Sequence, residues 1–192
     1  LMTATFDAHL LRLLEDMLGL KIESQNIFWG QIQSFQKRHI EMKIKYLWKT
    51  FKELSTDDLY AILNLRQKVF VMEQDCPYID ADYSDQEAFH LLGYDEKNIL
   101  KAYLRAFSPN IKYKGASMGR IVVEEGMRYK SIGKEITNIG IRFLSEKYPN
   151  HEIIISAQHR LQKFYEGFGF IARGEVYLED DIDHIQMYML SK

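Results

Sequence analysis

Cysteine and proline are scarce in this chain of 192 residues, which contains one cysteine, Cys76, and three prolines. A single cysteine excludes an internal disulfide and any metal cluster built from several thiolates. Because proteins without disulfides are typical of reducing compartments, we expect a cytoplasmic protein. The few prolines and the lack of any low-complexity tract leave little sequence that could serve as a disordered linker.

Long apolar runs and an excess of one charge are also missing. No run approaches the about 18 apolar residues of a membrane helix, so we expect no membrane insertion. The 25 basic and 27 acidic residues give a net charge of -2, which offers no general case for binding nucleic acid or an anionic membrane. The glycine-rich signatures Gly-x-x-x-x-Gly-Lys-Ser/Thr and Gly-x-Gly-x-x-Gly are absent, which argues against a nucleotide-binding protein.

The composition is that of a globular protein, with 46% hydrophobic and 27% charged residues, and the length suits one domain with an extension. We divide it into a helical segment, residues 1–41, and a domain, residues 42–192. In the segment, leucines between Leu10 and Leu18 predict an amphipathic helix, and we expect a second helix over Ile27–Ile40. Two interpretations stay open: an extension that packs on the domain or a partner, or translation from Met42 preceded by upstream sequence, which we favour.

From Met42 onward, the periodicity of apolar residues alternates between that of strands and that of helices. Ser55 is placed to cap the first helix. The expected strands cover residues 43–51, 90–94, 99–107, 120–123, 152–156, 168–177 and 184–190, and the expected helices cover 56–70, the segment following 131, and one that contains Phe164 and Tyr165. This order predicts a mixed α/β sheet with helices on both faces. The acidic loop over 71–85 lacks the glycine and the distal glutamate of a calcium-binding loop, so we expect no metal.

The organising stretch is Gly119–Leu144, where a β-branched strand runs through a polar turn into a helix that Ser131 is placed to cap. Arg128, Lys130 and Lys134 surround the start of this helix, and Gly133 would let a ligand approach the backbone. Free N–H groups and the helix dipole favour an anion there, so the junction is a candidate pyrophosphate site. An ordinary strand-to-helix turn with a solvated basic rim is the alternative.

Two motifs in this part of the chain resemble signatures of the GNAT superfamily of N-acetyltransferases. Arg128-x-x-x-x-Gly133 is similar to its acyl-CoA loop, Gln/Arg-x-x-Gly-x-Gly/Ala, although Ser131 stands where the first glycine is usual. The segments 156–158 and 164–170 resemble the second signature, in which a Phe-Tyr pair meets the CoA thioester. Further matches over 66–80, 119–121, 175–180 and 184–185 resemble the ElaA-like branch, and the resemblance covers about residues 43–192.

The resemblance implies a mostly antiparallel central sheet and transfer of an acetyl group from acetyl-CoA directly to a primary amine of a small molecule or peptide. Tyr165 is then the general acid that protonates the CoA thiolate, with a core aromatic residue as the alternative. The implied cofactor-binding residues are Ile121, Val122, Val123, Arg128, Tyr129, Lys130, Ser131, Ile132, Gly133, Lys134, Gln158 and Phe164.

The acceptor side is less defined by the sequence. The candidates for the catalytic base are Glu73, which we place with the catalytic residues, His90, Glu179 and His184. The same four are candidate substrate-binding residues, and solvent water as the base or a structural role for these side chains are the alternatives. We assign no role to His159. We expect no nucleic acid and no membrane partner, and a homodimer stays open. The alternative function is a non-catalytic acyl-CoA sensor or interaction domain, and the sequence leaves the amine and the acyl group unidentified.

Overall fold

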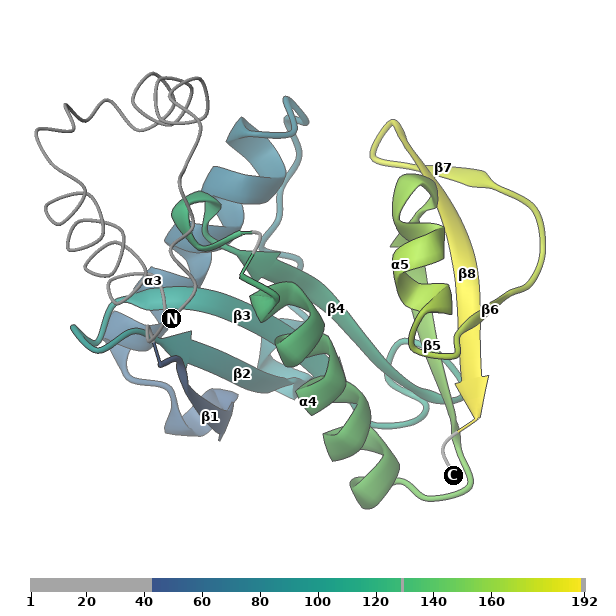
Figure 1. The fold of residues 1–192 in the computed structure, drawn as a ribbon, viewed down its shortest axis with the longest axis horizontal. Coiled ribbons are helices and arrows are strands. Elements are labelled where there is room, and N and C mark those ends of the chain that lie inside the picture. The colour runs from purple at the N-terminus through teal and green to yellow at the C-terminus, as the bar shows by residue number, and fades with distance from the viewer. Residues whose placement is uncertain (1–42, 129, 191–192) are drawn as a thin grey trace, which may run out of the picture. The chain divides into compact units, whose positions relative to one another are not determined.

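The computed structural model describes residues 43–128 and 130–190 (Figure 1). The helices expected in the segment 1–41 and the predicted cofactor residue Tyr129 lie outside the described residues, so the proposed division of the chain stays a prediction. No helix in the part that the structure describes is long and apolar enough to cross a membrane.

Within the described residues, eight strands form one sheet in the order β1-β2-β3-β4-β5-β8-β6, and β7 pairs with β8. Their bounds are β1 Lys45–Thr50, β2 Phe89–Tyr94, β3 Leu100–Phe107, β4 Ala116–Val123, β5 Glu152–Gln158, β6 Ile171–Ala172, β7 Tyr177–Glu179 and β8 Ile182–Leu190. Neighbouring strands are antiparallel except for β4 and β5, which are parallel. The mixed, mostly antiparallel sheet that we predicted is therefore confirmed.

The helices cover both faces of this sheet. They are α3 Thr56–Arg66, α4 Ile132–Lys147 and α5 Gln162–Glu166, with short turns η1 Phe51–Glu53, η2 Gln67–Met72, η3 Asp85–Glu87, η4 Glu125–Met127 and η5 His159–Leu161. Residues of α4 and α5 pack with Leu91, Leu104 and Met118 in the larger core, and α4 crosses the front of the sheet in Figure 1. Residues of α3 pack with Leu92 and Tyr103 in the second core. Because side chains alternate along a strand, these two cores lie on opposite faces.

Local sequence signals explain where α3 begins. The Ser55 side chain accepts a hydrogen bond from the Asp58 backbone N–H at 3.0 Å, and the Asp58 carboxylate accepts one from the Ser55 N–H at 2.9 Å. This reciprocal capping box satisfies two backbone donors that a helix start leaves free. The predicted cap at Ser55 is therefore confirmed.

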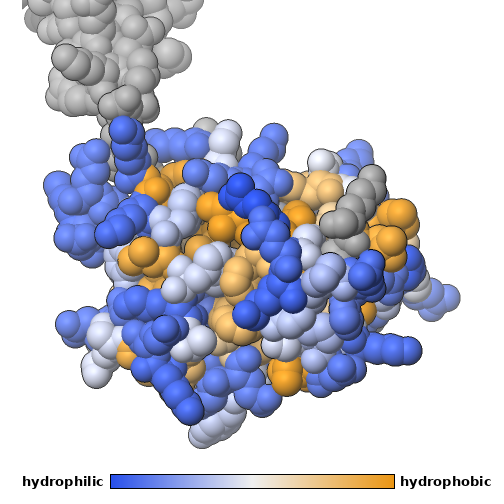
Figure 2. All heavy atoms as spheres, turned by 90° about the horizontal axis from the view of Figure 1, so that it is seen from below, coloured by the Kyte–Doolittle hydropathy of each residue, from blue (hydrophilic) through white to orange (hydrophobic). Residues whose placement is uncertain are grey.

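On the face shown in Figure 2, hydrophilic side chains surround smaller apolar patches.

The strand expected over residues 168–177 is wrong as one element. The structure has only β6 and β7 there, separated by four residues. Gly169 and Gly174 have φ angles of 95° and 89°, a region that side-chain-bearing residues rarely adopt and that strands do not use. The two glycines therefore turn the chain before each short strand begins.

The strands β4 and β5 pair only at their beginnings, through Ala116 with Ile153 and Ser117 with Ile154. Farther along β4, the register with β3 shifts between Tyr103 and Arg105, so that Arg120 and Ile121 together face Leu104. Arg120 occupies the left-handed region with φ of 50°, as the extra residue of a bulge often does. The bulge bends β4, and the two strands separate beyond Ser117.

Candidate active site

A cleft of about 770 Å³ lies where β4 and β5 separate. Most of the residues predicted from the sequence line it: Glu73, Ile121, Val122, Val123, Arg128, Gly133, Gln158, Phe164, Tyr165, Glu179 and His184. The predicted residues Lys130, Ser131, Ile132 and Lys134 belong to the chain around the start of α4, beside lining residue Gly133. The fold places the predicted site residue His90 outside the cleft, fully buried in the protein.

The start of α4 forms one end of the cleft. Ser131 precedes the helix with φ of 60° and ψ of 6°, a left-handed conformation that glycine adopts without cost. This explains why glycine is usual at that place of the motif. The side chain of Ser131 makes no capping hydrogen bond, so our prediction that it caps the helix is wrong; its backbone carbonyl accepts the first helical bond, from the Glu135 N–H at 2.9 Å.

Gly133, in the first turn of α4, borders open space. A Cβ atom built on it meets no heavy atom within 4 Å outside its own helix turn. The first turn of a helix has N–H groups without intrahelical partners, and the helix dipole adds positive potential there. The side chains of Lys130 and Lys134 are exposed next to this turn. This end of the cleft therefore has the features of a phosphate-binding helix start.

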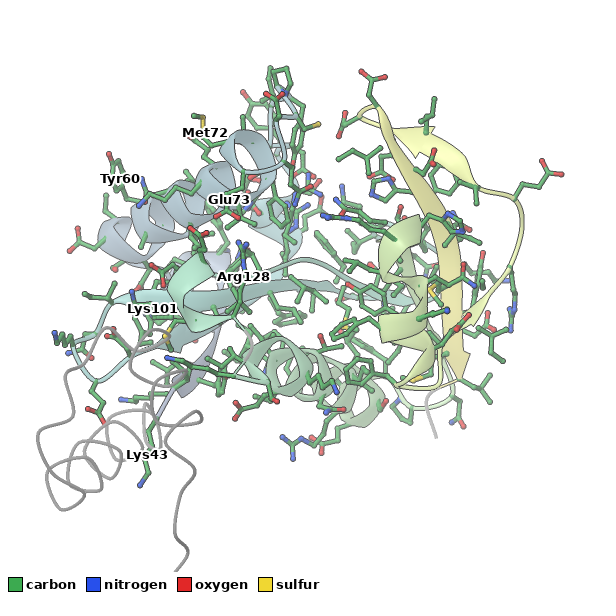
Figure 3. All side chains as sticks on the ribbon, turned by 45° about the horizontal axis from the view of Figure 1, so that its top comes forward. Lys43, Tyr60, Met72, Glu73, Lys101 and Arg128 are labelled. Carbon is green, nitrogen blue, oxygen red and sulfur yellow. The ribbon has the colours of Figure 1, made fainter. Side chains whose placement is uncertain are left out.

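Arg128 connects this end of the cleft to the loop after η2. Its Nε donates to the carbonyl of Val123 at 3.2 Å, and its guanidinium forms an ion pair with the Glu73 carboxylate. Figure 3 shows the two side chains meeting from different elements of the fold. The sequence separation of 55 residues hid this contact from sequence reasoning. In this structure, the charge of Glu73 is thus compensated by the residue expected to bind phosphate.

Tyr165 lies in the cleft with 8% of its surface exposed. Its ring packs edge-on against Phe164 and Phe170, at centroid distances of 5.1 Å and 6.0 Å. Among the residues that the structure describes, none forms a hydrogen bond with its hydroxyl. Burial raises the pKa of Tyr165 to about 12 because the phenolate would lose its hydration. The phenol is therefore protonated throughout the ordinary pH range.

A buried charge network holds the acidic loop between η2 and η3 against the sheet. Arg66 is fully buried and donates to Asp80 at 2.6 Å and to Asp85 at 2.8 Å. Arg105 donates to Asp85 at 2.8 Å and to Asp82 at 2.7 Å. Burial alone would raise the pKa of Asp80, but Arg66 and a second arginine, Arg120, outweigh it and hold that pKa below its usual range. These carboxylates are thus structural, a role that the sequence did not reveal because their arginine partners come from other elements of the fold.

His90 belongs to this network. Its ring is fully buried, with Nε2 2.9 Å from the carbonyl of Asp85 and Nδ1 2.7 Å from the hydroxyl of Tyr103. A carbonyl only accepts, so Nε2 carries the hydrogen and Nδ1 accepts from the tyrosine. Burial lowers the pKa of His90 by disfavouring its charged form. With both nitrogens bonded, His90 does not line the cleft, and its position fits the structural alternative that the sequence left open.

The opposite wall of the cleft is built by β5, β7 and β8. Ser156 Oγ lies 2.6 Å from the Tyr177 hydroxyl and donates to the Glu179 carboxylate at 2.7 Å. His184 Nδ1 lies 2.8 Å from the carbonyl of Ile182, and its ring is 6.3 Å from that of Tyr177. Sequence reasoning missed Ser156 and Tyr177 here, because hydroxyl side chains carry no signal until the strands are paired.

Two buried polar atoms in residues that line the cleft have no hydrogen-bond partner among the described residues. They are Arg105 Nε and Ser117 Oγ. Unpaired buried polar groups are rare in folded proteins and need an explanation at each site. Gly119 pairs with Arg105 and follows Ser117 by two residues, so all three lie on the same face of the sheet, and a Cβ atom built on Gly119 meets nothing within 4 Å. The cleft therefore continues across this face of β4, away from the α4 end.

Comparison with known proteins agrees with this geometry. A family model described as the acetyltransferase (GNAT) domain matches residues 51–191. The chain belongs to the GNAT acetyltransferase family. Protein ElaA from Escherichia coli is 38% identical over 137 residues, which cover 70% of this chain and 89% of that protein. The ElaA-like resemblance predicted from the sequence is therefore confirmed.

Solved structures show the same relationship. The crystal structure of E. coli ElaA matches with a TM-score of 0.71 and 36% identity, and an acyl-CoA N-acyltransferase from Pseudomonas aeruginosa matches with 0.72 and 34%. Each match covers 76% of this chain and 99% of the solved chain. The spermidine N-acetyltransferase of Vibrio cholerae, solved with CoA and spermine, shares the fold at 19% identity and a TM-score of 0.56, covering 76% of this chain and 95% of its own. The GNAT fold and family thus assign the chain to the acyltransferases.

Proposed function

We propose that this protein is an N-acetyltransferase that moves the acetyl group of acetyl-CoA directly to a primary amine of a small molecule or peptide. The observation that carries the proposal is the position of Tyr165, a protonated phenol in the cleft that opens at the start of α4, with no hydrogen bond from its hydroxyl to any described residue. Acetyl-CoA supplies the acetyl group as a thioester. The protein has to hold both reactants, admit a neutral amine and protonate the departing sulfur.

The α4 end of the cleft suits the coenzyme. The N–H groups around Gly133, together with Arg128, Lys130 and Lys134, would hold the pyrophosphate, joined by Tyr129, Ser131 and Ile132 of the same loop. Beyond Ser117, no strand among the described residues pairs with β4 on its β5 side, so the edge of β4 formed by Ile121, Val122 and Val123 would be open to the amide arm of CoA. The Val123 carbonyl is the exception, because it already accepts from Arg128 Nε. Gln158 and Phe164 line the facing wall. The V. cholerae relative in fold, solved with CoA, supports a coenzyme of this kind.

Tyr165 would act as the general acid. A phenol with a pKa of about 12 keeps its proton at neutral pH and can transfer it to a thiolate as the C–S bond breaks. Cys76, which also lines the cleft, is less suited to form an acyl intermediate because its Sγ donates to the carbonyl of Asp180 at 3.1 Å. Direct transfer between acetyl-CoA and the amine is therefore the simpler route.

The wall formed by β5, β7 and β8 would receive the amine. Glu179 lines the cleft, and no cation forms an ion pair with it among the residues that the structure describes, so its carboxylate is available to attract an ammonium group. Glu73 could contribute a second carboxylate once Arg128 is engaged by phosphate. The spermine bound to the V. cholerae enzyme supports a small-molecule amine.

The test is the substitution Tyr165→Phe, which removes only the hydroxyl. We expect kcat to fall by about 10²–10⁴, the range for a lost general acid, while acetyl-CoA affinity stays within about twofold. Thiol release over a panel of amines measures turnover, and calorimetric titration with acetyl-CoA measures affinity. Tyr60→Phe, at a tyrosine with 74% of its surface exposed outside the cleft, is the matched control.

Either of two results would contradict the proposal. A Tyr165→Phe variant with the wild-type rate would remove the acid role. Tight acetyl-CoA binding by the wild type without turnover on any amine would favour the alternative, a non-catalytic acyl-CoA sensor.

A further inference from the structure

Resting on the acetyl transfer proposed above, we propose that His184 is the general base that takes the proton of the acceptor amine. His184 lies on β8, next to the end of β5, and lines the same cleft as Tyr165. The inference comes from three features of the structure: the tautomer of its ring, the engagement of the other candidates, and the face of the sheet from which it reaches the cleft.

The tautomer of His184 is fixed by one hydrogen bond. Its Nδ1 lies 2.8 Å from the backbone carbonyl of Ile182, and a carbonyl can only accept, so Nδ1 carries the hydrogen. In the neutral ring, Nε2 is then the atom with the free lone pair. Among the described residues, none forms a hydrogen bond with Nε2. The bond to Ile182 therefore orients an imidazole whose basic nitrogen is unoccupied.

The other basic groups considered from the sequence are engaged. His90 has both ring nitrogens bonded inside the protein, to Asp85 and Tyr103. The Glu73 carboxylate is paired with Arg128. The carboxylate of Glu179 accepts a hydrogen bond from the Ser156 hydroxyl at 2.7 Å, and its negative charge suits it to attract the ammonium group. Glu179 also lines the cleft and keeps its Oε1 free of described hydrogen bonds, but a carboxylate is intrinsically a weaker base than an imidazole. Of these four residues, His184 is therefore the best placed to take the proton of an amine.

His184 and Tyr165 reach the cleft from opposite faces of the sheet. Ile185 on β8 and Ala157 on β5 are paired and lie with Tyr165 in the larger core. Because successive side chains on a strand point to opposite faces, His184 and its partner Gln158 project to the other face. A thioester held between the separating strands β4 and β5 would thus have the acid on one side and the base on the other.

The proton transfers balance with these two groups. The amine nitrogen first loses a proton to His184 Nε2, which leaves its lone pair free to form the new C–N bond. As that bond forms, the C–S bond breaks, and the sulfur takes the proton of the Tyr165 hydroxyl. The nitrogen then loses its second proton to the Tyr165 phenolate, and the imidazolium of His184 releases its proton to solvent. Both residues thereby return to their starting protonation states. The products are the amide, CoA as its thiol and one proton if the amine entered as an ammonium ion.

The surroundings of His184 contain few other groups that could take over this role. Tyr177 and Glu179 come from β7, Gln158 comes from β5, and the side chain of Arg160 donates to Gln158 at 2.9 Å. Neither an amide nor a guanidinium accepts a proton near neutral pH. Removal of the imidazole should therefore leave the cleft without a base of suitable strength at this place.

The experiment compares His184→Ala and His184→Asn with wild type, using the full chain. Asparagine keeps an N–H donor for the carbonyl of Ile182 and removes the basic nitrogen, so it remains informative if alanine disturbs β8. His159→Ala is the control, because His159 does not line the cleft. The probes are two classes of amine: alkylamines such as spermidine and tyramine, which are ammonium ions at neutral pH, and a hydrazide, which is already neutral there.

We expect both His184 variants to bind acetyl-CoA as wild type does and to lose about 10²–10⁴-fold in kcat/KM with alkylamines at neutral pH. The loss should shrink at least tenfold with the hydrazide, and added imidazole should restore part of the alkylamine rate. Equal losses with both classes of amine, or no loss, would overturn the base role while leaving the acetyltransferase function intact. A wild-type protein that binds acetyl-CoA but turns over no amine would overturn the proposed function and the base role together.

Discussion

Replacing Gly133 by alanine tests the coenzyme end of the cleft with a single methyl group. Gly133 lies in the first turn of α4, outside the left-handed region of backbone conformation, and an added Cβ meets no heavy atom within 4 Å beyond its own helix turn. The substitution therefore fits the free protein without strain. Because alanine is favoured over glycine in a helix by about 0.5–1 kcal/mol, we expect the variant to be more stable than wild type. For a chain of this size, that gain raises Tm by about 1–4 °C.

The same methyl group would occupy the space that a phosphate needs to reach the N–H groups of α4. Each hydrogen bond from a backbone N–H to a charged group is worth about 1.5–3 kcal/mol. Loss of one such bond weakens acetyl-CoA binding by roughly 10- to 150-fold. The variant should thus be more stable and bind the coenzyme more weakly, a combination that general damage to the fold cannot produce.

Thermal unfolding and calorimetric titration with CoA measure the two effects. Gly126→Ala is the matched control, because Gly126 lies in the neighbouring turn η4, does not line the cleft, and has only one atom, Glu124 Oε2, at 3.5 Å from an added Cβ. This control should bind CoA with wild-type affinity. If Gly133→Ala melts higher and still binds CoA as tightly as wild type, the start of α4 does not hold the pyrophosphate.

Two further predictions concern charges around the cleft. Glu73→Gln should strengthen acetyl-CoA binding about two- to fivefold, since a partly exposed ion pair of up to about 1 kcal/mol no longer competes for Arg128; unchanged affinity in calorimetry would show that the pair does not compete. Asp80→Asn should lower the free energy of unfolding by about 3–5 kcal/mol, because it removes the buried carboxylate that Arg66 and Arg120 share and leaves Asp85 as the remaining carboxylate partner of the buried Arg66. Since the pKa of Asp80 is lowered in the folded state, its contribution is complete above the unfolded pKa near about 4 and is lost as pH falls below it. The free energies of unfolding of wild type and Asp80→Asn, measured in urea, should therefore differ most above pH about 5 and become equal in acid. A difference that does not change with pH would contradict this reasoning.

The elements of the fold could be predicted from the sequence because their signals are local. Apolar residues at helical spacing predicted α4, and the Ser55–Asp58 capping box predicted where α3 begins. The prediction of one continuous strand over 168–177 was wrong because of two glycines whose conformation the local sequence does not fix. A glycine permits an extended as well as a left-handed backbone, and only the packing of the chain selected the left-handed conformation at Gly169 and Gly174.

The residues of the candidate site also fall into two groups, those that local sequence predicted and those that only the fold brought together. The coenzyme motif and the Phe164–Tyr165 pair were found from the sequence because each lies within one loop or helix, and a few residues of spacing suffice to describe them. The pairing of Glu73 with Arg128 and the free nitrogen of His184 depend on residues brought together by the order of strands in the sheet.

The sequence by itself determined the family, the alternation of strands and helices, and the residues around the start of α4. The tertiary structure decided which charged groups are paired with an opposite charge and which polar atoms in the cleft have no bonded partner among the described residues. It also decided from which face of the sheet each side chain enters the cleft. The physical reason is the separation along the chain between the residues that interact. Helix periodicity, capping and turn chemistry act over a few neighbouring residues, whereas the burial of Arg66 and the exposure of the cleft at Gly119 result from contacts between distant segments, whose energies depend on the complete fold.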